Sequence, residues 1–249
     1  MPVWPPNVGR RVLTSVDSTM AEAARIAPTV AGPEWVLALE QTAGHGRRGR
    51  AWASASGNFM ASLVLHPAET PDTVALRSFV AALALRDALI DATGRSDGLA
   101  LKWPNDVLLN GGKVAGILLE SIGAGARVDH LIIGIGVNLA TAPAASEVEP
   151  GATPPVSLVS ETGALVTPEE FLDLLAPAYA RHEASFVTYG FEPIRTAWLA
   201  GAAKLGETIT ARTMRETMTG RFETIDTHGN LVLQTAKGAR SIAAAEIFF

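Results

Sequence analysis

The spacing of apolar residues changes its period near Gly206, and this change constrains the fold more than any other feature of the 249-residue sequence. Before that point, apolar residues recur at helical spacing between short apolar runs. After it, apolar and polar residues alternate over 208–212, 221–225 and 231–234, with a turn at 228–230. Short strands with glycine turns and no helical pattern predict a small β-barrel. We therefore expect one domain over residues 1–204 and a barrel over residues 205–249.

Helical and strand patterns are interspersed in the first of these domains. A capping box of Thr19 and Glu22 predicts a helix start, and Pro168 with a second box of Thr167 and Glu170 predicts another. A long helix is expected from Pro71 to about residue 94, and a shorter one over 194–199. Strands are expected over 12–13, 35–39, 60–65, 99–101, 107–109, 114–119 and 131–137, with a hairpin turn at 110–112 and a loop over 140–155.

Composition excludes several classes of protein. With no cysteine, the chain is neither a disulfide scaffold nor a cysteine-dependent enzyme or Cys-bound zinc protein. Its apolar runs are shorter than the roughly 18 residues of a membrane span, and residues 1–6 do not resemble a signal peptide. The net charge of −5 argues against a general nucleic-acid coat. We expect a cytoplasmic protein.

A glycine-rich basic loop follows the expected strand at 35–39. It reads Gly44-His45-Gly46-Arg47-Arg48-Gly49-Arg50, and Trp52 comes shortly after it. Glycine lets a backbone approach a ligand closely, and guanidinium groups make paired contacts with phosphate or carboxylate. The loop lacks the Gly-Lys-Ser/Thr of a P-loop and does not open a helix as a dinucleotide fingerprint does. An anion-binding loop and a solvated basic hairpin both remain open interpretations.

A second segment, Lys102-Trp103-Pro104-Asn105-Asp106, places polar residues at the end of an expected strand, because proline interrupts strand pairing. The carboxylate of Asp106 is a candidate ligand for Mg²⁺, which prefers oxygen atoms. Lys113 follows two glycines and opens an apolar strand, which favours a lysine directed at an anionic ligand. A solvated surface lysine is the alternative.

The third segment, Ile133-Gly134-Ile135-Gly136-Val137-Asn138, ends the expected strand over 131–137. Glycine in an apolar strand indicates close approach of another backbone or of a ligand. The side-chain amide of Asn138 offers both donors and acceptors, which suits the edge of an adenine ring. A strand that ends in a turn asparagine is the alternative.

Together, and in this order, these segments resemble the biotin protein ligases, enzymes that attach biotin to a lysine of a carrier protein. The resemblance covers most of the chain and includes residues 17–19, 41–52, 102–106, 113–120, 134–138 and the terminal β module. It implies an α/β catalytic domain with a mixed sheet, followed by an SH3-like barrel. It also implies two steps: the biotin carboxylate attacks the α-phosphate of ATP, releasing pyrophosphate, and a carrier lysine then displaces AMP from the biotinyl-5′-adenylate.

The resemblance also implies roles for individual residues. Lys113, Arg47 and Asp106 are the expected catalytic residues, with Asp106 holding Mg²⁺. The implied biotin-binding residues are Ser18, Thr19, Gln41, Gly44, His45, Gly46, Arg47, Lys113 and Gly116. The implied ATP-binding residues are Arg47, Arg50, Trp52, Asn105, Lys113 and Asn138. The expected partner is the biotin carboxyl carrier protein of acetyl-CoA carboxylase or of another biotin-dependent carboxylase. Neither nucleic acid nor membrane is expected as a partner, and homodimer formation is left open.

Two positions depart from the pattern of that family. Met20 follows Ser18-Thr19 where the family usually has asparagine, so one hydrogen bond to biotin is missing or comes from elsewhere. His45 replaces an arginine of the basic loop, and a histidine is only partly charged near neutral pH. We expect the adenylate to be held more weakly as a result.

Other functions stay open beside this one. A lipoate or octanoate ligase or transferase shares the implied catalytic fold, and a non-catalytic biotin- or nucleotide-binding regulator would use the same residues. A plain nucleic-acid binder is disfavoured by the net charge of −5. Some family members carry an N-terminal winged helix-turn-helix and repress transcription. Because the Ser-Thr segment comes at position 18, we expect a form without that domain and without repressor activity.

Overall fold

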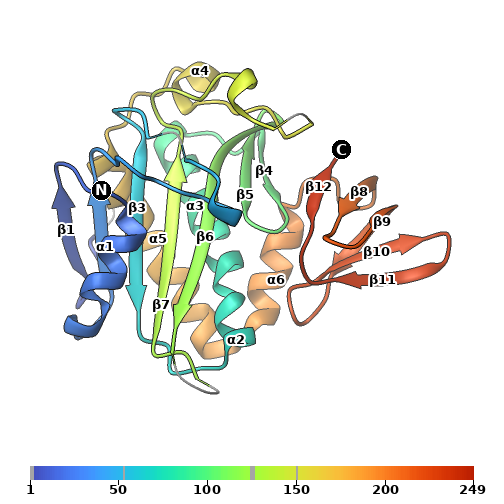
Figure 1. The fold of residues 1–249 in the computed structure, drawn as a ribbon, viewed down its shortest axis with the longest axis horizontal. Coiled ribbons are helices and arrows are strands. Elements are labelled where there is room, and N and C mark those ends of the chain that lie inside the picture. The colour runs from blue at the N-terminus through green and yellow to red at the C-terminus, as the bar shows by residue number, and fades with distance from the viewer. Residues whose placement is uncertain (1–2, 53, 124–126, 150) are drawn as a thin grey trace.

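The computed structural model describes residues 3–52, 54–123, 127–149 and 151–249, and its larger part is built on a seven-stranded sheet (Figure 1). The strands are β1 (Gly9–Leu13), β2 (Glu34–Ala38), β3 (Phe59–Leu65), β4 (Leu99–Lys102), β5 (Asp106–Leu109), β6 (Gly112–Ile122) and β7 (His130–Val137). Their order in the sheet is β1-β2-β3-β7-β6-β5-β4. β1 pairs with β2 in parallel and the other neighbours are antiparallel, so the expected mixed sheet is confirmed.

Helices cover both faces of this sheet (Figure 1). They are α1 (Thr19–Ile26), α2 (Pro71–Ala75), α3 (Arg77–Thr93), α4 (Leu158–Thr162), α5 (Pro168–Tyr189) and α6 (Phe191–Ala200). On β2, Trp35 and Leu37 join the core beneath α3 and α5, whereas Val36 packs with the residues of α1 on the other face. Both faces of the strand are therefore buried, which explains its continuous apolar sequence.

Two local predictions about helices need correction. The helix expected from Pro71 is interrupted, because the N–H of Leu76 donates to the carbonyl of Thr73 in a tight turn between α2 and α3. The capping box expected at Thr19 is also wrong: Ser18 is the N-cap, and it makes no capping hydrogen bond through its side chain. The hydroxyl of Thr19 instead accepts a hydrogen bond from Ser62, at 2.9 Å.

The second predicted capping box is confirmed at the start of α5. The N–H of Glu170 donates to the hydroxyl of Thr167 at 3.2 Å, and the N–H of Thr167 donates to the carboxylate of Glu170 at 2.8 Å. The hairpin turn between β5 and β6 is confirmed as well. Asn110 and Gly111 both have positive φ angles, 50° and 83°, as a tight two-residue turn between antiparallel strands requires.

The C-terminal part is a second, antiparallel sheet, as the alternating sequence predicts (Figure 1). Its strands are β8 (Thr208–Arg212), β9 (Thr217–Ile225), β10 (Leu231–Thr235), β11 (Gly238–Ile242) and β12 (Glu246–Phe248), in the order β11-β10-β9-β8-β12. Its buried side chains join the core of the larger part, and the indole of Trp103 donates to the carbonyl of Gly229 at 3.0 Å. These contacts hold the small sheet beside β4 and β5.

None of the described helices combines the length and the apolar character that a membrane crossing requires.

Candidate active site

A cavity of about 670 Å³ lies among the sheet, the basic loop of residues 44–50 and β12. This volume is typical of sites for small molecules and cofactors. The predicted residues that line it are Ser18, Thr19, Gln41, His45, Gly46, Arg47, Arg50, Trp52, Asn105, Asp106, Lys113, Gly116 and Asn138. Gly44 is not among the lining residues. A Cβ at Gly44 would lie 2.7 Å from both Gln41 Nε2 and Ser54 Oγ, so this glycine lets the loop pack closely on Gln41.

The floor of the cavity is a row of cross-strand neighbours from four strands. Met60 of β3 is paired with Gly136 of β7, Gly136 with Gly116 of β6, and Gly116 with Asp106 of β5. The indole of Trp52 lies over the two glycines: a Cβ at Gly136 would be 2.4 Å from that ring, and one at Gly116 would be 3.2 Å from it. The close approach expected from these strand glycines is therefore made by a tryptophan side chain.

Trp52 also carries an unmatched polar group. Its indole Nε1 is buried and has no hydrogen-bond partner among the described residues. Because a buried donor without a partner costs about 1–3 kcal/mol, this N–H is suited to an acceptor brought by a ligand.

One end of the cavity is small and mostly uncharged. Ser18 and Thr19, at the start of α1, are both buried. The backbone N–H of Thr19 donates to the side-chain oxygen of Gln41 at 2.7 Å, which orients the amide of Gln41. Met20 packs onto the sheet at Gly134, where a Cβ would lie 2.4 Å from its sulfur. Hydroxyl, amide and thioether groups here suit a neutral polar ligand better than an anion.

The other end of the cavity is charged. The Lys113 ammonium lies 2.7 Å from the carboxylate of Asp106, across the hairpin formed by β5 and β6. Arg47 donates to the side-chain oxygen of Asn105 at 3.2 Å, and the amide of Asn105 donates to the carbonyl of Ile117. Burial lowers the pKa of Arg47 from its ordinary value, and the charge of Asp106 opposes this. Asn105 thus uses its amide to position Arg47, a contact that its sequence motif did not predict.

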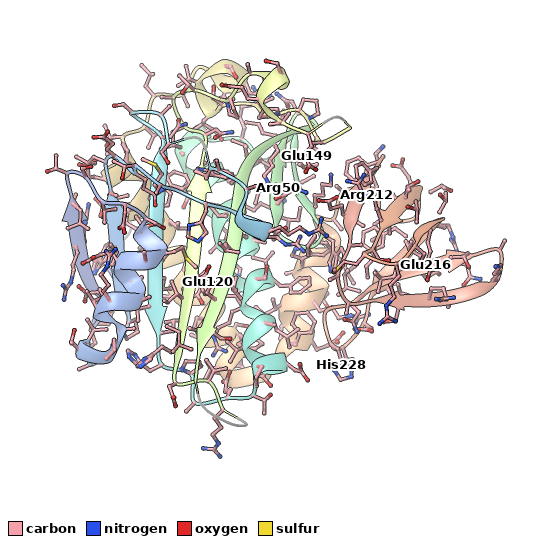
Figure 2. All side chains as sticks on the ribbon, in the orientation of Figure 1. Arg50, Glu120, Glu149, Arg212, Glu216 and His228 are labelled. Atoms are coloured by element: carbon pink, nitrogen blue, oxygen red, sulfur yellow. The ribbon has the colours of Figure 1, made fainter. Side chains whose placement is uncertain are left out.

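The basic loop is a closed turn tied to the C-terminal sheet. Within it, the N–H of Gly46 donates to the carbonyl of Arg50 at 2.7 Å. The carboxylate of Glu246, on β12, accepts hydrogen bonds from Arg48 at 2.8 Å, from Arg50, and from Arg212 at 2.5 Å. Arg50 also pairs with Glu149 at 3.0 Å, and Figure 2 shows Arg50, Glu149 and Arg212 gathered where the two sheets meet.

These arginines change the acidity of Glu246. Burial would raise the pKa of its carboxyl group, but hydrogen bonds from Arg212 and Arg50 outweigh that effect and lower the pKa to about 2. The carboxylate therefore stays charged at every physiological pH and holds the loop against β12. Glu246 was not predicted as a site residue. A strand of three residues is too short to show an alternating apolar pattern, and the arginine partners of Glu246 are distant in sequence.

Two further predicted residues have defined partners. Asn138 is buried, and its amide donates to the carbonyl of Val156 at 3.1 Å, which ties the end of β7 to the loop that follows. The ring of His45 lies 3.4 Å from the carboxylate of Glu120, on β6. Lys102 lines the cavity although its motif was predicted without a role for it, and Met60, Thr153 and Phe248 also line it without having been predicted.

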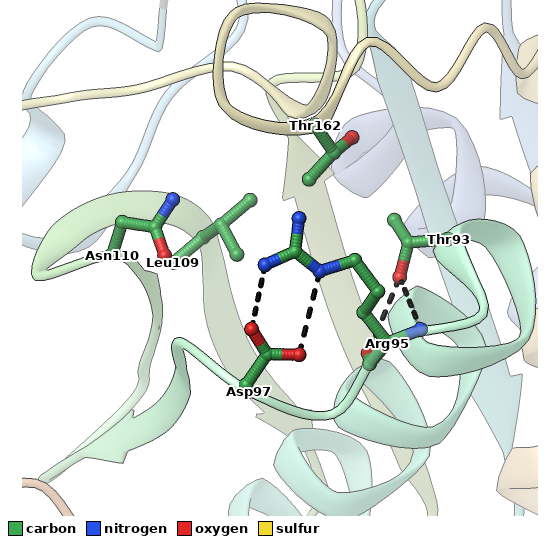
Figure 3. Close-up of a pocket in the computed structure, with 6 residues that line it drawn as sticks. All are labelled: Thr93, Arg95, Asp97, Leu109, Asn110 and Thr162. Atoms are coloured by element: carbon green, nitrogen blue, oxygen red, sulfur yellow. Dashed lines mark hydrogen bonds and ion pairs between the residues drawn. The ribbon is translucent and has the colours of Figure 1, made fainter.

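A second hollow lies away from this site. It encloses only about 10 Å³, beside the hairpin turn at Asn110 (Figure 3). Arg95 closes it by pairing with Asp97 at 2.6 Å, as Figure 3 shows. A space of this size holds at most about one water molecule, so it is not a candidate site.

Two family models match the chain. The first, "Biotin/lipoate A/B protein ligase family", matches residues 11–138, which contain most of the cavity-lining residues. The second, "Biotin protein ligase C terminal domain", matches residues 204–249 and so includes the second sheet. The fold and the site together therefore define a ligase of the biotin and lipoate class.

Comparison with individual proteins distinguishes between the biotin and the lipoate ligases of this class. A "Biotin--[acetyl-CoA-carboxylase] ligase" from Paracoccus denitrificans is 60% identical over 238 residues, which are 96% of this chain and 99% of that protein. A "Bifunctional ligase/repressor BirA" from Bacillus subtilis is 34% identical over 85% of this chain and 65% of that protein. The solved structure of an Aquifex aeolicus biotin protein ligase in complex with biotin and ATP superimposes with a TM-score of 0.81 at 27% identity, over 96% of this chain and 97% of that one. This chain belongs to the biotin protein ligase family.

Proposed function

We propose that this protein is an ATP-dependent ligase that forms biotinyl-5′-adenylate and transfers biotin to a lysine of a biotin carboxyl carrier protein. The observation that carries this proposal is the polarity of the cavity. Hydroxyl and amide groups of Ser18, Thr19 and Gln41 line one end, and Lys113, Arg47 and Asp106 line the other. Biotin has the same asymmetry, with a neutral ureido group at one end and a carboxylate at the other.

The first step joins two anions, so it needs positive charge at their meeting point. Lys113 and Arg47 attract the biotin carboxylate and the α-phosphate and stabilise the charge that develops between them. A carboxylate oxygen forms the new bond to phosphorus, the bond to the bridging oxygen of pyrophosphate breaks, and pyrophosphate leaves with that electron pair. The tie between Lys113 and Asp106 keeps the ammonium oriented at 2.7 Å from its partner.

Mg²⁺ fits this end of the cavity as a companion of ATP. No group of three or more histidine or acidic side chains among the described residues could hold a metal by itself. Mg²⁺ is commonly held by one or two carboxylates together with substrate phosphates, and Asp106 supplies one carboxylate in the cavity. When bound, Mg²⁺ neutralises phosphate charge, and Asp106 is the residue that would hold it.

In the second step the amine of the carrier lysine attacks the carbonyl carbon of biotinyl-5′-adenylate. The nitrogen forms the new amide bond, the bond between the carbonyl carbon and the phosphate oxygen breaks, AMP leaves with that electron pair, and the proton lost by the amine passes to water. Trp52 and Asn138 line the cavity, and we assign them to the adenine. Arg50 is expected to close the basic loop over the adenylate and keep water from the anhydride.

The proposal also includes the carrier protein, the cellular compartment, the domain boundary and the expected partners. The carrier is that of acetyl-CoA carboxylase or of a similar biotin-dependent carboxylase, and the reaction takes place in the cytoplasm. Residues 1–204 form the catalytic domain and residues 205–249 the barrel, a division supported by the end of α6 at Ala200 and the start of β8 at Thr208. Nucleic acid is not a partner, in keeping with the net charge of −5.

The test is release of AMP and pyrophosphate from ATP and Mg²⁺ with biotin, with and without an apo carrier domain. We expect pyrophosphate with biotin alone, AMP only when the carrier is present, and neither with the Lys113→Ala variant. Lipoate replaces biotin in a parallel reaction, because the first family model covers both classes of ligase. Turnover with lipoate and none with biotin would refute the proposal, as would binding of biotin without pyrophosphate release.

A further inference from the structure

Lys102 is a buried cation whose surroundings leave its charge poorly compensated. It ends β4, lines the cavity and is only 8% exposed. Its ammonium donates to the hydroxyl of Thr153 at 2.6 Å and lies 4.6 Å from the ring centre of Phe249. Among the described residues, no carboxylate oxygen comes within 4.0 Å of this ammonium. A hydroxyl and an aromatic ring compensate a buried charge only in part.

A second buried cation, Arg77, has its charge fully compensated by acidic side chains. Arg77 and Lys102 are the two basic residues that are buried in the described part of the chain. Arg77 pairs with Glu69 at 2.5 Å and with Glu183 at 2.8 Å, so its charge is matched twice within the fold. Since an unpaired buried charge is expensive, the lack of such a partner beside Lys102 points to an anion supplied by a ligand.

The groups around Lys102 support this reading. Burial lowers the pKa of Lys102 and the nearby Lys113 lowers it further, while the carboxylates of Asp106 and Glu246 oppose both effects. Lys102 and Asp106 are register partners in the hairpin of β4 and β5, and Asp106 in turn pairs with Lys113. The close ion pair of Asp106 is with Lys113, so among the described residues neither Asp106 nor Glu246 forms a close ion pair with Lys102.

The position of Lys102 indicates which part of the substrate it meets. Thr19 begins α1 and Ser18 is its N-cap, and α1 packs against β2, β3 and β7. Lys102 ends β4, which Figure 1 shows on the other side of the sheet, next to β12, and its ammonium faces the ring of Phe249. Counted from α1, the strand order β7-β6-β5-β4 places Lys102, at the end of β4, beyond Lys113 of β6 and Asp106 of β5. If the biotin carboxylate meets Lys113, as the proposed function requires, the β- and γ-phosphates are the anionic groups of the substrates that would extend beyond it.

We propose that Lys102 binds the β- and γ-phosphates of ATP and holds pyrophosphate as it leaves during adenylation, an inference that rests on the proposed function. The ammonium keeps its proton throughout: it exchanges the hydroxyl of Thr153 for phosphate oxygens and stabilises the charge that collects on the leaving group. The transfer of biotin to the carrier, which involves no pyrophosphate, does not use Lys102.

The experiment compares Lys102→Met and Lys102→Arg with Lys204→Met. Lys204 is a matched control, since its ammonium also faces the ring of Phe249, at 6.0 Å, but is exposed and pairs with Glu207 at 2.9 Å. Biotin-dependent exchange of labelled pyrophosphate into ATP reports the first step. Transfer from chemically prepared biotinyl-5′-adenylate to the apo carrier reports the second. Calorimetry with Mg²⁺ and inorganic pyrophosphate measures the anion site without biotin, and thermal melting checks folding.

For Lys102→Met we expect exchange to fall by about 10²-fold, with a weaker Kd for pyrophosphate, unchanged transfer from the prepared adenylate and an unchanged or higher Tm. Lys102→Arg should recover part of the exchange, and Lys204→Met should match the wild type. Equal losses in both steps, or unchanged pyrophosphate binding in Lys102→Met, would overturn the proposal. A wild-type chain that binds pyrophosphate through Lys102 but makes no biotinyl adenylate would refute the proposed function while supporting the anion site.

Discussion

The ammonium of Lys113 and the carboxylate of Asp106 lie 2.7 Å apart on neighbouring strands, and both line the cavity of the candidate active site. Asp106 pairs with Lys113 and is also the residue proposed to hold Mg²⁺. Removing its charge should therefore impair adenylation in two ways, through the orientation of Lys113 and through the binding of Mg²⁺. Asp106→Asn keeps the shape of the side chain and removes only the charge.

We expect Asp106→Asn to lower biotin-dependent pyrophosphate exchange by about tenfold or more and to raise the Mg²⁺ concentration needed for half-maximal rate. The measurement is a magnesium titration of the exchange rate, with Asp97→Asn as a control, since Asp97 forms a surface pair with Arg95. A lower rate with an unchanged magnesium dependence would rule out Asp106 as the metal-binding residue.

Glu246→Gln should loosen the basic loop and change the acid sensitivity of the protein. The pKa of Glu246 is lowered from 4.5 to about 2, so its charged form stabilises the folded state above about pH 5, and this contribution is lost as the pH falls towards 2. The Tm difference between wild type and variant should therefore be largest near neutral pH and shrink in acid.

Melting curves between pH 3 and pH 7 provide the measurement. Glu216→Gln is the matched control, because Glu216 is an exposed glutamate in the loop between β8 and β9, paired with Arg240 at 3.3 Å. The ion-pair account fails if the Tm difference for Glu246→Gln is the same at every pH.

His45→Arg should slow the release of biotinyl-5′-adenylate. Arginine adds a fixed positive charge and a planar fork of donors to the loop, which strengthens contacts with the phosphate of the adenylate. Stopped-flow displacement of the adenylate measures the rate, and His228→Arg, in the β9–β10 turn, should leave it unchanged. Equal off-rates for wild type and His45→Arg at pH 8 would contradict the role assigned to position 45.

Arg77→Met should destabilise the fold without touching the site. It leaves the carboxylates of Glu69 and Glu183 without their shared cation, a loss of about 3–5 kcal/mol in the free energy of unfolding. Urea unfolding tests this, with Arg95→Met as a surface control that should change little. Adding Glu69→Gln and Glu183→Gln to Arg77→Met should restore part of the loss, and a failure to do so would mean that lost packing on Phe186 dominates.

Local sequence patterns predicted much of this structure. The turn at Asn110-Gly111 and the cap at Thr167 depend on neighbouring residues only, so their geometry follows directly from the chain. The interruption at Leu76 was not predictable, because the apolar stripe continues through it and the break depends on one hydrogen bond in a tight turn.

Part of the candidate site was predictable from local sequence and part was not. The basic loop and the Lys102–Asp106 segment are visible as motifs, and the cavity brings them together. The attachment of Arg48 and Arg50 to Glu246 was invisible, since it joins residues almost 200 positions apart through a three-residue strand. The role proposed for Lys102 was not predictable either. It rests on the lack of a carboxylate close to the buried ammonium, and a sequence pattern does not show which contacts a side chain lacks.

The indole of Trp52 lies directly on Gly136, so the substitutions that evolution can accept at these two positions depend on each other. A mutation that adds even a methyl group at Gly136 collides with the ring at 2.4 Å, so lineages can accept it only after Trp52 has become smaller. The order of the two changes therefore matters: shrinking the tryptophan first leaves a tolerable gap, whereas filling the glycine first closes the path. Positions 52 and 136 should accordingly vary together among descendants of this protein, and rarely one without the other.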